Sequence, residues 1–330
     1  MTSIKDVAKA AGVSTATVSR ILSNADAPIR PETRQRVLKA IADLNYRPNL
    51  VARSLRVQRT AKIGLVVSDI RNPFFTAIGR AVEDAAYEQG YSVLMCNTDE
   101  NPEKEALYLE SLHDENVAGI IFSPTQQFSA RLKQYNSNIP FVVIDRSVES
   151  NDVDMVLLDN IAAAYELTTH LIENGYQKLA GLFGNVSTTG QERSRGFHKA
   201  LKDHGLNAVA AHFIAPRIKQ GYDATMTLLQ GAERPDAIFT SNSLLTAGAF
   251  QAIRDSRLSI PGEVALVGFD ETTWGTLVDP PVTVIAQPTE EIGRTATELL
   301  FQRIADPNRA PKKVILKGQL LVRGSSHMQN

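Results

Sequence analysis

The sequence predicts a small all-α unit at the N-terminus, followed by an α/β core of two parallel-sheet subdomains. The N-terminal unit and the core differ in charge, because residues 1–60 carry a net charge of +7 and the remaining residues a net charge of −8. Apolar residues recur at helical spacing at the N-terminus, whereas short apolar runs alternate with amphipathic segments over the rest. The second part is longer than one comfortable hydrophobic core, which favours two subdomains.

The N-terminal residues predict three helices. The first has apolar residues at helical spacing, namely Ile4, Val7, Ala8 and Ala11. Gly12 ends this helix, because a positive φ costs little at glycine, and Ser14 is a good N-cap for the second. The inner face of the second helix is expected to be Val18, Ile21 and Leu22. A third helix is expected to start after Pro31-Glu32 and to continue through Leu44.

Two short helices around a tight turn are typical of a helix-turn-helix, whose second helix lies in the major groove of DNA. Arg20 can bind guanine O6 and N7 with both arms of its guanidinium, and Thr15 and Ala16 offer methyl contacts to thymine. The alternative is that Arg20 is an ordinary surface arginine of a three-helix bundle. The residues of this helix expected to contact DNA are Ser14, Thr15, Ala16, Thr17 and Arg20.

A basic segment follows the third helix. Pro48 ends that helix, because the residue before a proline is disfavoured in the α region, and Asn49 can cap a helix over residues 50–56. So short a helix is unstable unless a partner holds it. Leu55 lies among arginines, which suits a minor-groove wedge, although a charged linker with an incidental leucine is the alternative. The residues of this segment expected to contact DNA are Asn49, Ala52, Arg53 and Leu55.

The core is expected to alternate strands with helices. Short apolar runs predict strands at 62–68, 91–96, 118–122, 141–144, 179–183, 237–240, 264–268 and 282–286. Amphipathic segments predict helices that include 75–89, 160–174, 195–204 and 244–254. This alternation is typical of parallel sheets covered on both faces. A ligand is expected between the subdomains, beyond the carboxyl ends of the strands.

Residues 3–59 resemble the DNA-binding headpiece and hinge helix of the LacI/GalR family of bacterial transcription regulators. The matching stretches are IKDVAKAAGVSTATVSRIL, RPETRQRVLKAIADLNYRPN and VARSL. The rest of the chain resembles the family's effector-binding core. The resemblance implies a periplasmic-binding-protein-like core whose chain crosses between two lobes three times. It also implies binding to a palindromic operator in double-stranded DNA as a homodimer, with a tetramer as the alternative.

The expected domains follow from these elements and this resemblance. Residues 1–46 form a helix-turn-helix headpiece, 47–60 a hinge helix and linker, and 61–330 an effector-binding and dimerisation core. Within the core, lobe 1 is expected at about 61–160 and 289–320, and lobe 2 at about 161–288 and 321–330.

Residues that follow the predicted strands are candidates for the effector site. By resemblance, the family's effector positions fall on Arg193, Asn242, Asp270 and Gln287. The aromatic candidates for walls are Phe74, Phe75, Tyr222, Phe269 and Trp274. Alternatives remain, because Arg193 and Asp270 could form only an ion pair between the lobes, and Phe75 and Phe269 could be core. For Trp274, the only tryptophan, we favour stacking on a ligand ring.

Arginines near the expected cleft suggest an anionic effector. The number of arginines expected near the cleft exceeds the number of carboxylates: Arg71, Arg146, Arg193 and Arg195 stand against chiefly Asp270. A guanidinium fork matches a carboxylate or a phosphate. The family commonly carries Asn-Asp where this chain has Asn242-Ser243, so one carboxylate is missing.

Several stretches also resemble regulators of ketogluconate and ketodeoxygluconate catabolism, namely MCNTDENPEKE, VVIDRS and GFDETTWGTLVDPPVTVIAQPTEEIGRTA. We therefore expect a ligand-switched repressor of sugar-acid catabolism that 2-ketogluconate or a related keto sugar acid releases from DNA. A regulator that responds to a neutral sugar or a phosphosugar is the alternative.

Other classes of protein are less well supported. The histidines lack metal-ligand spacing, and the chain has no nucleophile signature or phosphate-binding glycine loop, so we expect no metal, no cofactor and no enzyme. The competing hypotheses are a sugar-modifying enzyme with a DNA-binding head and a sugar-binding transport protein of the same core fold. The basic head and the missing signal peptide argue against the transport protein.

Two features bear on where the protein acts and on its chain end. No apolar run reaches membrane-spanning length, so we expect a cytoplasmic protein without a membrane partner. The single cysteine, Cys96, excludes an intramolecular disulfide. Residues 324–328, GSSHM, resemble a cloning scar.

Overall fold

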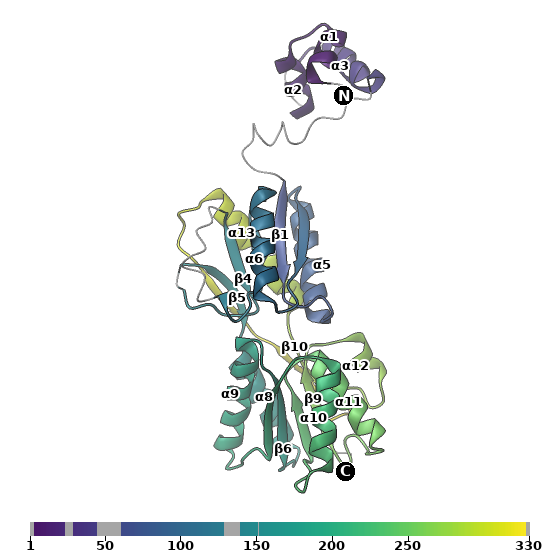
Figure 1. The fold of residues 1–330 in the computed structure, drawn as a ribbon, viewed down its shortest axis with the longest axis vertical. Coiled ribbons are helices and arrows are strands. Elements are labelled where there is room, and N and C mark those ends of the chain that lie inside the picture. The colour runs from purple at the N-terminus through teal and green to yellow at the C-terminus, as the bar shows by residue number, and fades with distance from the viewer. Residues whose placement is uncertain (1–2, 24–28, 45–60, 129–138, 151, 328–330) are drawn as a thin grey trace. The chain divides into compact units, whose positions relative to one another are not determined.

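The chain forms two units that divide after Thr60 (Figure 1). The computed structural model describes residues 3–23, 29–44, 61–128, 139–150 and 152–327. Within these ranges, none of the helices combines the length and the apolar character that crossing a bilayer requires.

The N-terminal unit, called the headpiece below, contains three helices. Their bounds are α1 (Ile4–Ala11), α2 (Thr15–Ser23) and α3 (Pro31–Asp43). Gly12 ends α1 with a φ of 63°, which places it in the left-handed region that glycine adopts readily. Val7, Val18 and Val37, one from each helix, are fully buried and form the centre of a small core. The predicted all-α fold of this unit is confirmed.

Two six-stranded sheets form the second unit. The first has the order β11-β5-β4-β3-β1-β2, and the second has the order β12-β10-β9-β8-β6-β7. The bounds in the first sheet are β1 (Lys62–Val67), β2 (Ser92–Asn97), β3 (Ile120–Phe122), β4 (Phe141–Ile144), β5 (Asp154–Leu158) and β11 (Lys313–Leu316). The bounds in the second are β6 (Leu179–Gly184), β7 (Ala210–Ile214), β8 (Ala237–Thr240), β9 (Ala265–Phe269), β10 (Thr283–Ala286) and β12 (Gln319–Leu321). Every pairing is parallel except that of β10 with β12, so the predicted parallel sheets are confirmed.

Helices cover both faces of each sheet. In lobe 1, α5 (Pro73–Glu88) and α13 (Thr289–Ala305) pack on one face, and α6 (Pro102–Asp114) packs on the other. Leu65 and Val66, neighbours in β1, point to these two opposite faces. In lobe 2, α8 (Asn160–Glu173) and α9 (Thr188–Asp203) cover one face, and α10 (Ile218–Gln230) and α11 (Ser243–Asp255) cover the other. The short α12 (Thr273–Leu277) follows β9.

The chain crosses between the lobes three times, after β5, after β10 and after β11. Strand β12 pairs with β10 of lobe 2, so the expected lobe boundary between residues 320 and 321 falls inside a strand of that lobe. Helix α9 begins at Thr188, earlier than the expected start at residue 195, because Ser187 caps it by accepting a hydrogen bond from Gly190 N.

Residues 324–327, which belong to the stretch that resembles a cloning scar, are part of the fold of lobe 2. Ser325 and Ser326 are 0% exposed. The Ser325 hydroxyl accepts a hydrogen bond from Thr283 N at 2.8 Å and donates to Leu266 O at 2.5 Å. This segment therefore ties β9 to the start of β10.

Candidate effector cavity and DNA-binding helix

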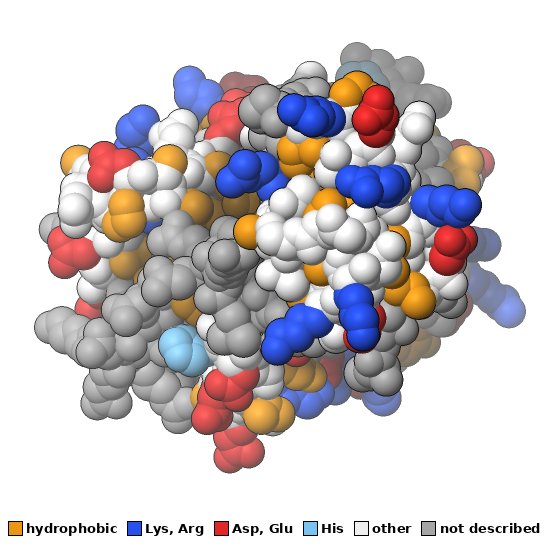
Figure 2. Space-filling view, turned by 90° about the horizontal axis from the view of Figure 1, so that it is seen from above, with side chains coloured by type: hydrophobic (Ala, Val, Ile, Leu, Met, Phe, Trp, Pro, Cys, Tyr) orange, Lys and Arg blue, Asp and Glu red, His pale blue; other side chains and the backbone are white. Residues whose placement is uncertain are grey.

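Helix α2 presents residues that are expected to contact DNA. Thr15, Ala16 and Arg20 are exposed on it. The Ser14 hydroxyl accepts a hydrogen bond from Thr17 N at 3.1 Å and lies 2.9 Å from the Thr17 hydroxyl, which caps the helix. Exposed basic side chains of the same unit include Lys5, Lys9, Arg36 and Lys39, and Figure 2 shows several Lys and Arg side chains on the face turned toward the viewer. This surface suits contact with a polyanion. The predicted contacts Asn49, Ala52, Arg53 and Leu55 lie outside the described residues.

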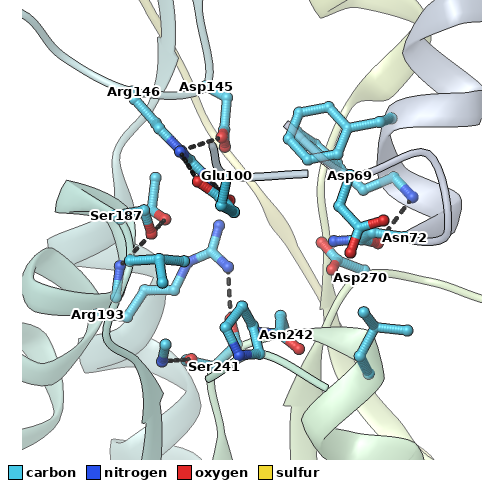
Figure 3. Close-up of a pocket in the computed structure, with 18 of the residues that line it drawn as sticks. Asp69, Asn72, Glu100, Asp145, Arg146, Ser187, Arg193, Ser241, Asn242 and Asp270 are labelled. Carbon is cyan, nitrogen blue, oxygen red and sulfur yellow. Dashed lines mark hydrogen bonds and ion pairs between the residues drawn. The ribbon is translucent and has the colours of Figure 1, made fainter. Parts of the chain in front are cut away.

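A cavity lies between the lobes, at the carboxyl ends of the strands (Figure 3). It contains about 580 Å³ of empty space when the open solvent at its mouth is included. The predicted effector residues among its lining are Phe74, Phe75, Arg146, Arg193, Asn242, Asp270 and Gln287. The remaining lining residues include Asp69, Asn72, Glu100, Asp145, Ser187, Thr189 and Ser241.

Three neighbours hold the guanidinium of Arg193, which is 4% exposed. Its Nε donates to Asn160 Oδ1 at 2.8 Å, and its Nη1 donates to Ser241 O at 2.6 Å. Its Cζ lies 4.1 Å from the centre of the Phe269 ring, in cation–π geometry. Burial lowers the pKa of Arg193, while the charges of Asp270 and Asp145 oppose this shift. In Figure 3 the third nitrogen points into the cavity, so this group can donate to a ligand.

Arg146 is committed to carboxylates of its own lobe. Its Nη1 donates to Glu100 at 2.8 Å and to Pro124 O at 2.9 Å, its Nη2 also contacts Glu100, and its Nε lies 3.3 Å from Asp145 Oδ2. Burial alone would lower the pKa of Arg146, but the hydrogen bonds and charges of Glu100 and Asp145 outweigh it and raise that pKa. Burial also raises the pKa of Asp145. This cluster leaves Arg146 little capacity to pair with an anion.

Asp270 joins several parts of lobe 2 at the cavity wall. Its Oδ1 accepts a hydrogen bond from Gln287 Nε2 at 2.6 Å, and its Oδ2 accepts one from Ser243 N at 3.2 Å. Asp270, Asp145 and Glu100 all have a positive φ, at 72°, 67° and 61°. Non-glycine residues rarely adopt this conformation, and such strain gathers at functional sites. The acidic wall of the cavity is therefore held in a costly geometry.

Helix N-termini from both lobes face the cavity. Asn72 caps α5 by accepting a hydrogen bond from Phe74 N at 3.1 Å, and Asn242 caps α11 by accepting one from Leu245 N at 2.9 Å. Ser187 caps α9, and Thr189 lies in the first turn of that helix. The partial positive charge of these helix ends offsets part of the acidic charge around the cavity.

Five predicted effector residues lie outside the cavity lining. Arg71 and Arg195 are exposed, and Arg71 binds Asp69 through Nε and Nη2, each at 2.9 Å. Phe269 is fully buried in the core beneath Arg193. Tyr222 and Trp274 belong to lobe 2 away from the lining.

The contacts of Tyr222 and Trp274 explain their positions. A hydrogen bond to Asp255 raises the pKa of the Tyr222 phenol. Trp274 packs edge-on against Phe250, with the ring centres 6.0 Å apart, in the apolar cluster beneath α11. The aromatic wall of the cavity is therefore Phe74 and Phe75 rather than Trp274.

The expected surplus of arginine is wrong for the cavity lining. The lining contains two guanidiniums, of Arg146 and Arg193, and four carboxylates, of Asp69, Glu100, Asp145 and Asp270. Arg71 and Arg195 follow strands in the sequence, but both are exposed in the structure, and position after a strand does not reveal this exposure. Among the described residues, no group of His, Cys, Asp and Glu side chains is arranged to hold a metal ion.

The prediction also missed polar residues of the site. Asp69, Asp145 and Ser241 each follow a strand, so the same strand-end signal could have selected them. Glu100 lies in the loop after β2, which ends at Asn97. Asn160 is the first residue of α8, which follows a crossing between the lobes. No local signal marks Asn160, because its role depends on Arg193, which is distant in the chain.

Comparisons with known proteins cover both units. Residues 3–49 match the family model "Bacterial regulatory proteins, lacI family", and residues 60–322 match "Periplasmic binding proteins and sugar binding domain of LacI family". The HTH-type transcriptional repressor PurR of Histophilus somni (strain 2336) is 34% identical over 332 residues, which cover 98% of this chain and 99% of the relative.

Two further proteins are similar over nearly their whole length. The ribose operon repressor of Escherichia coli (strain K12) is 32% identical over 331 residues, 99% of this chain and 100% of the relative. A solved structure of the Lac repressor dimer, bound to operator and the anti-inducer ONPF, has a TM-score of 0.89 at 26% identity, with 99% of each chain covered.

Proposed function

Because the chain belongs to the LacI family of bacterial regulatory proteins, we propose that it represses transcription until a neutral sugar enters its cavity. Family membership makes the chain a ligand-responsive DNA-binding regulator rather than an enzyme. The class of effector and the direction of the response are the proposal.

The pairing of charges around the cavity is the observation that supports a neutral ligand. Glu100 and Asp145 pair with Arg146, and Asp69 pairs with Arg71. The guanidiniums of these two arginines therefore have little positive charge left to attract an anionic ligand. Carboxylates accept hydrogen bonds from hydroxyl groups, and they repel a carboxylate or a phosphate. Phe74 and Phe75 offer an apolar surface for the carbon face of a ring. The name of the ribose operon repressor agrees with a neutral sugar as ligand.

A sugar acid is the second candidate, and one observation favours it. The hydrogen bonds of Arg193 go to the neutral oxygens of Asn160 and Ser241, and no described carboxylate forms an ion pair with it. A ligand carboxylate could therefore pair with its third nitrogen. This candidate includes 2-ketogluconate, on the resemblance of several stretches of the sequence.

We also propose that the chain acts as a homodimer on a near-palindromic operator. The headpiece has one recognition helix, and a two-fold axis would place two such helices in successive major grooves, about 34 Å apart. The dimeric Lac repressor bound to its operator supports this arrangement, and a tetramer is the alternative. A regulator of this kind acts where the DNA is, which is the cytoplasm in bacteria.

A thermal-shift screen of the full chain tests the class of effector. The screen compares matched pairs, such as ribose with ribonate and glucose with gluconate and 2-ketogluconate, because a ligand of the native state raises Tm. A larger shift with a neutral sugar supports the first candidate, and a larger shift with its acid supports the second. Asp270→Asn, which removes a carboxylate from the wall, should reduce the shift from the neutral sugar.

A further inference from the structure

One side-chain hydrogen bond joins the two lobes across the cleft. The Ser243 hydroxyl, at the start of α11 in lobe 2, donates to Asn72 Oδ1, at the start of α5 in lobe 1, over 3.1 Å. Among the described residues, the other side-chain hydrogen bonds and ion pairs lie within one lobe or at the crossing segments. This bond therefore reports directly on whether the lobes are together.

The direction of this bond follows from the helix cap. Asn72 Oδ1 already accepts a hydrogen bond from Phe74 N, so the oxygen rather than the amide nitrogen must face the start of α5. Ser243 must then be the donor. The backbone N of Ser243 is bound separately to Asp270 Oδ2, which fixes the residue while its hydroxyl reaches across the cleft.

The bond also lies beside the proposed effector site. Asn72 and Asp270 both line the cavity, and Ser243 is 2% exposed between them. Water has little access to the hydroxyl in this closed arrangement, so an unmade bond would leave a buried polar group without a partner. Opening the lobes breaks the bond and exposes both groups.

We propose that the Ser243–Asn72 hydrogen bond is a latch that holds the lobes closed in the ligand-free chain and thereby sets effector affinity. The apparent dissociation constant is the intrinsic one divided by the fraction of the chain in the closed state, so a latch that favours closure tightens binding. The consequence for the effector rests on the proposed function, whereas the effect on closure does not.

Two substitutions of Ser243 separate the latch from the cap. Ser243→Ala removes the donor and leaves the backbone bond to Asp270 possible. Ser243→Thr keeps the hydroxyl and is the rescue variant. Ser256→Ala, at the other end of the same helix, is the matched control, because its hydroxyl contacts Met226 within lobe 2.

The distance between the lobes is measured in the full chain without ligand. Spin labels are placed at Arg80→Cys on α5 and Lys219→Cys on α10, whose native side chains are 74% and 78% exposed. Cys96 is replaced by alanine, and labelled chains are diluted with unlabelled ones so that distances within one chain are recorded. Pulsed electron–electron resonance then gives the ratio of open to closed chains.

Ser243→Ala should raise the ratio of open to closed chains by about three- to tenfold, the effect of one lost neutral hydrogen bond. Ser243→Thr and Ser256→Ala should resemble the parent chain. An unchanged distribution in Ser243→Ala would overturn the latch, as would an equal opening in Ser243→Thr.

Binding of the sugar found by the thermal-shift screen gives the second readout. Its dissociation constant should rise in Ser243→Ala by the ratio of the closed fraction of the parent to that of the variant, which the distance measurement gives for each. A dissociation constant that does not follow the measured closed fractions would overturn the second half of the proposal. A parent chain that binds neither sugars nor their acids would refute the proposed function, while the distance measurement would still decide the latch.

Discussion

Arg193 is the residue whose environment best defines the cavity. Its guanidinium is held by Asn160, by the Ser241 carbonyl and by the ring of Phe269, so it reaches the cavity already oriented. An oriented donor loses little conformational entropy when a ligand binds. A lysine at this position could carry the charge but not the planar contacts.

We therefore expect Arg193→Lys to weaken effector binding by roughly 10- to 100-fold, the range for loss of a charge-assisted hydrogen bond. Titration calorimetry with the sugar found by thermal shift measures this loss. Operator binding without ligand should stay within about twofold of the parent, because the substitution lies in the other unit of the chain. Loss of operator binding in this variant would mean that Arg193 supports the fold of the core.

Arg20 is the exposed residue of α2 expected to read a base. Arg20→Ala should cost about 1–3 kcal/mol in binding to the operator and little in binding to random DNA. Fluorescence anisotropy with both DNAs gives this difference. Equal losses on the two would make Arg20 a phosphate contact instead.

His170 links stability to pH through its contact with the C-terminal segment. Its Nε2 lies 2.8 Å from the hydroxyl of the fully buried Ser326, and burial lowers the pKa of His170 from its usual 6.5. The unfolded chain therefore takes up a proton at this residue before the folded chain does. The free energy of unfolding should be highest above pH 6.5 and should decrease as the pH falls below that value.

Denaturant titrations above and below pH 6.5 measure this decrease, and His170→Gln should make it smaller. His212→Gln is the control, because His212 is exposed on β7. An identical decrease in the parent and in His170→Gln would assign the pH dependence to other groups.

Helix α9 owes its position to a close approach between two glycines. A Cβ on Gly190 would lie 2.0 Å from the carbonyl oxygen of Gly184 at the end of β6, so only glycine allows this contact. The same helix carries Ser187 as its cap, and Thr189 and Arg193 at the cavity. A shift of the helix start would therefore move the polar groups of the site.

Gly190→Ala should destabilise the core by about 2 kcal/mol or more and weaken effector binding, because the helix must move away from β6. Denaturant titration and calorimetry measure the two effects. Gly231→Ala, at the end of α10, should change both little, since its nearest neighbour would be an ordinary 3.4 Å away. Gly190→Ala with parental stability would show that the strand end yields to the added methyl group.

The elements that the sequence predicted are those with a strong local signal. Buried parallel strands such as β1 and β6 read as continuous apolar runs, and the headpiece helices have a regular apolar spacing and a good cap. Strand β7 was missed because it is an edge strand with three exposed residues in its middle. Strand β5 was missed because it begins at the buried Asp154, whose partners Arg303 and Arg309 are distant in the chain.

The difference between local signals and contacts distant in the chain also explains which features of the site could be predicted. The family resemblance selected Arg193, Asn242 and Asp270, and the last two reach the cavity because parallel strands place their carboxyl ends at one edge. The charge of the site was misjudged because it depends on pairings such as Arg146 with Glu100, which no spacing in the sequence reveals. Trp274 was misplaced because a polar loop in the sequence packs as a helix against Phe250.

In the whole molecule, function requires that a ligand in the core changes how the headpiece binds DNA. A ligand can shift such an equilibrium only by its difference in affinity for the two states. Charge is divided between the two units as well, because residues 1–60 carry a net charge of +7 and the remaining residues a net charge of −8. The division predicts that the affinity for operator falls steeply with salt, whereas the affinity for a neutral sugar hardly changes.

The most direct test measures the affinity of the full chain for its operator with and without a saturating neutral sugar. The operator is first selected from random DNA, and the sugar is the one that raises Tm most in the matched screen. Sugar should weaken operator binding by about 5- to 150-fold, the usual range of coupling between two sites, and should leave binding to random DNA unchanged. A sugar that occupies the cavity and leaves operator affinity unchanged would contradict the proposed switch.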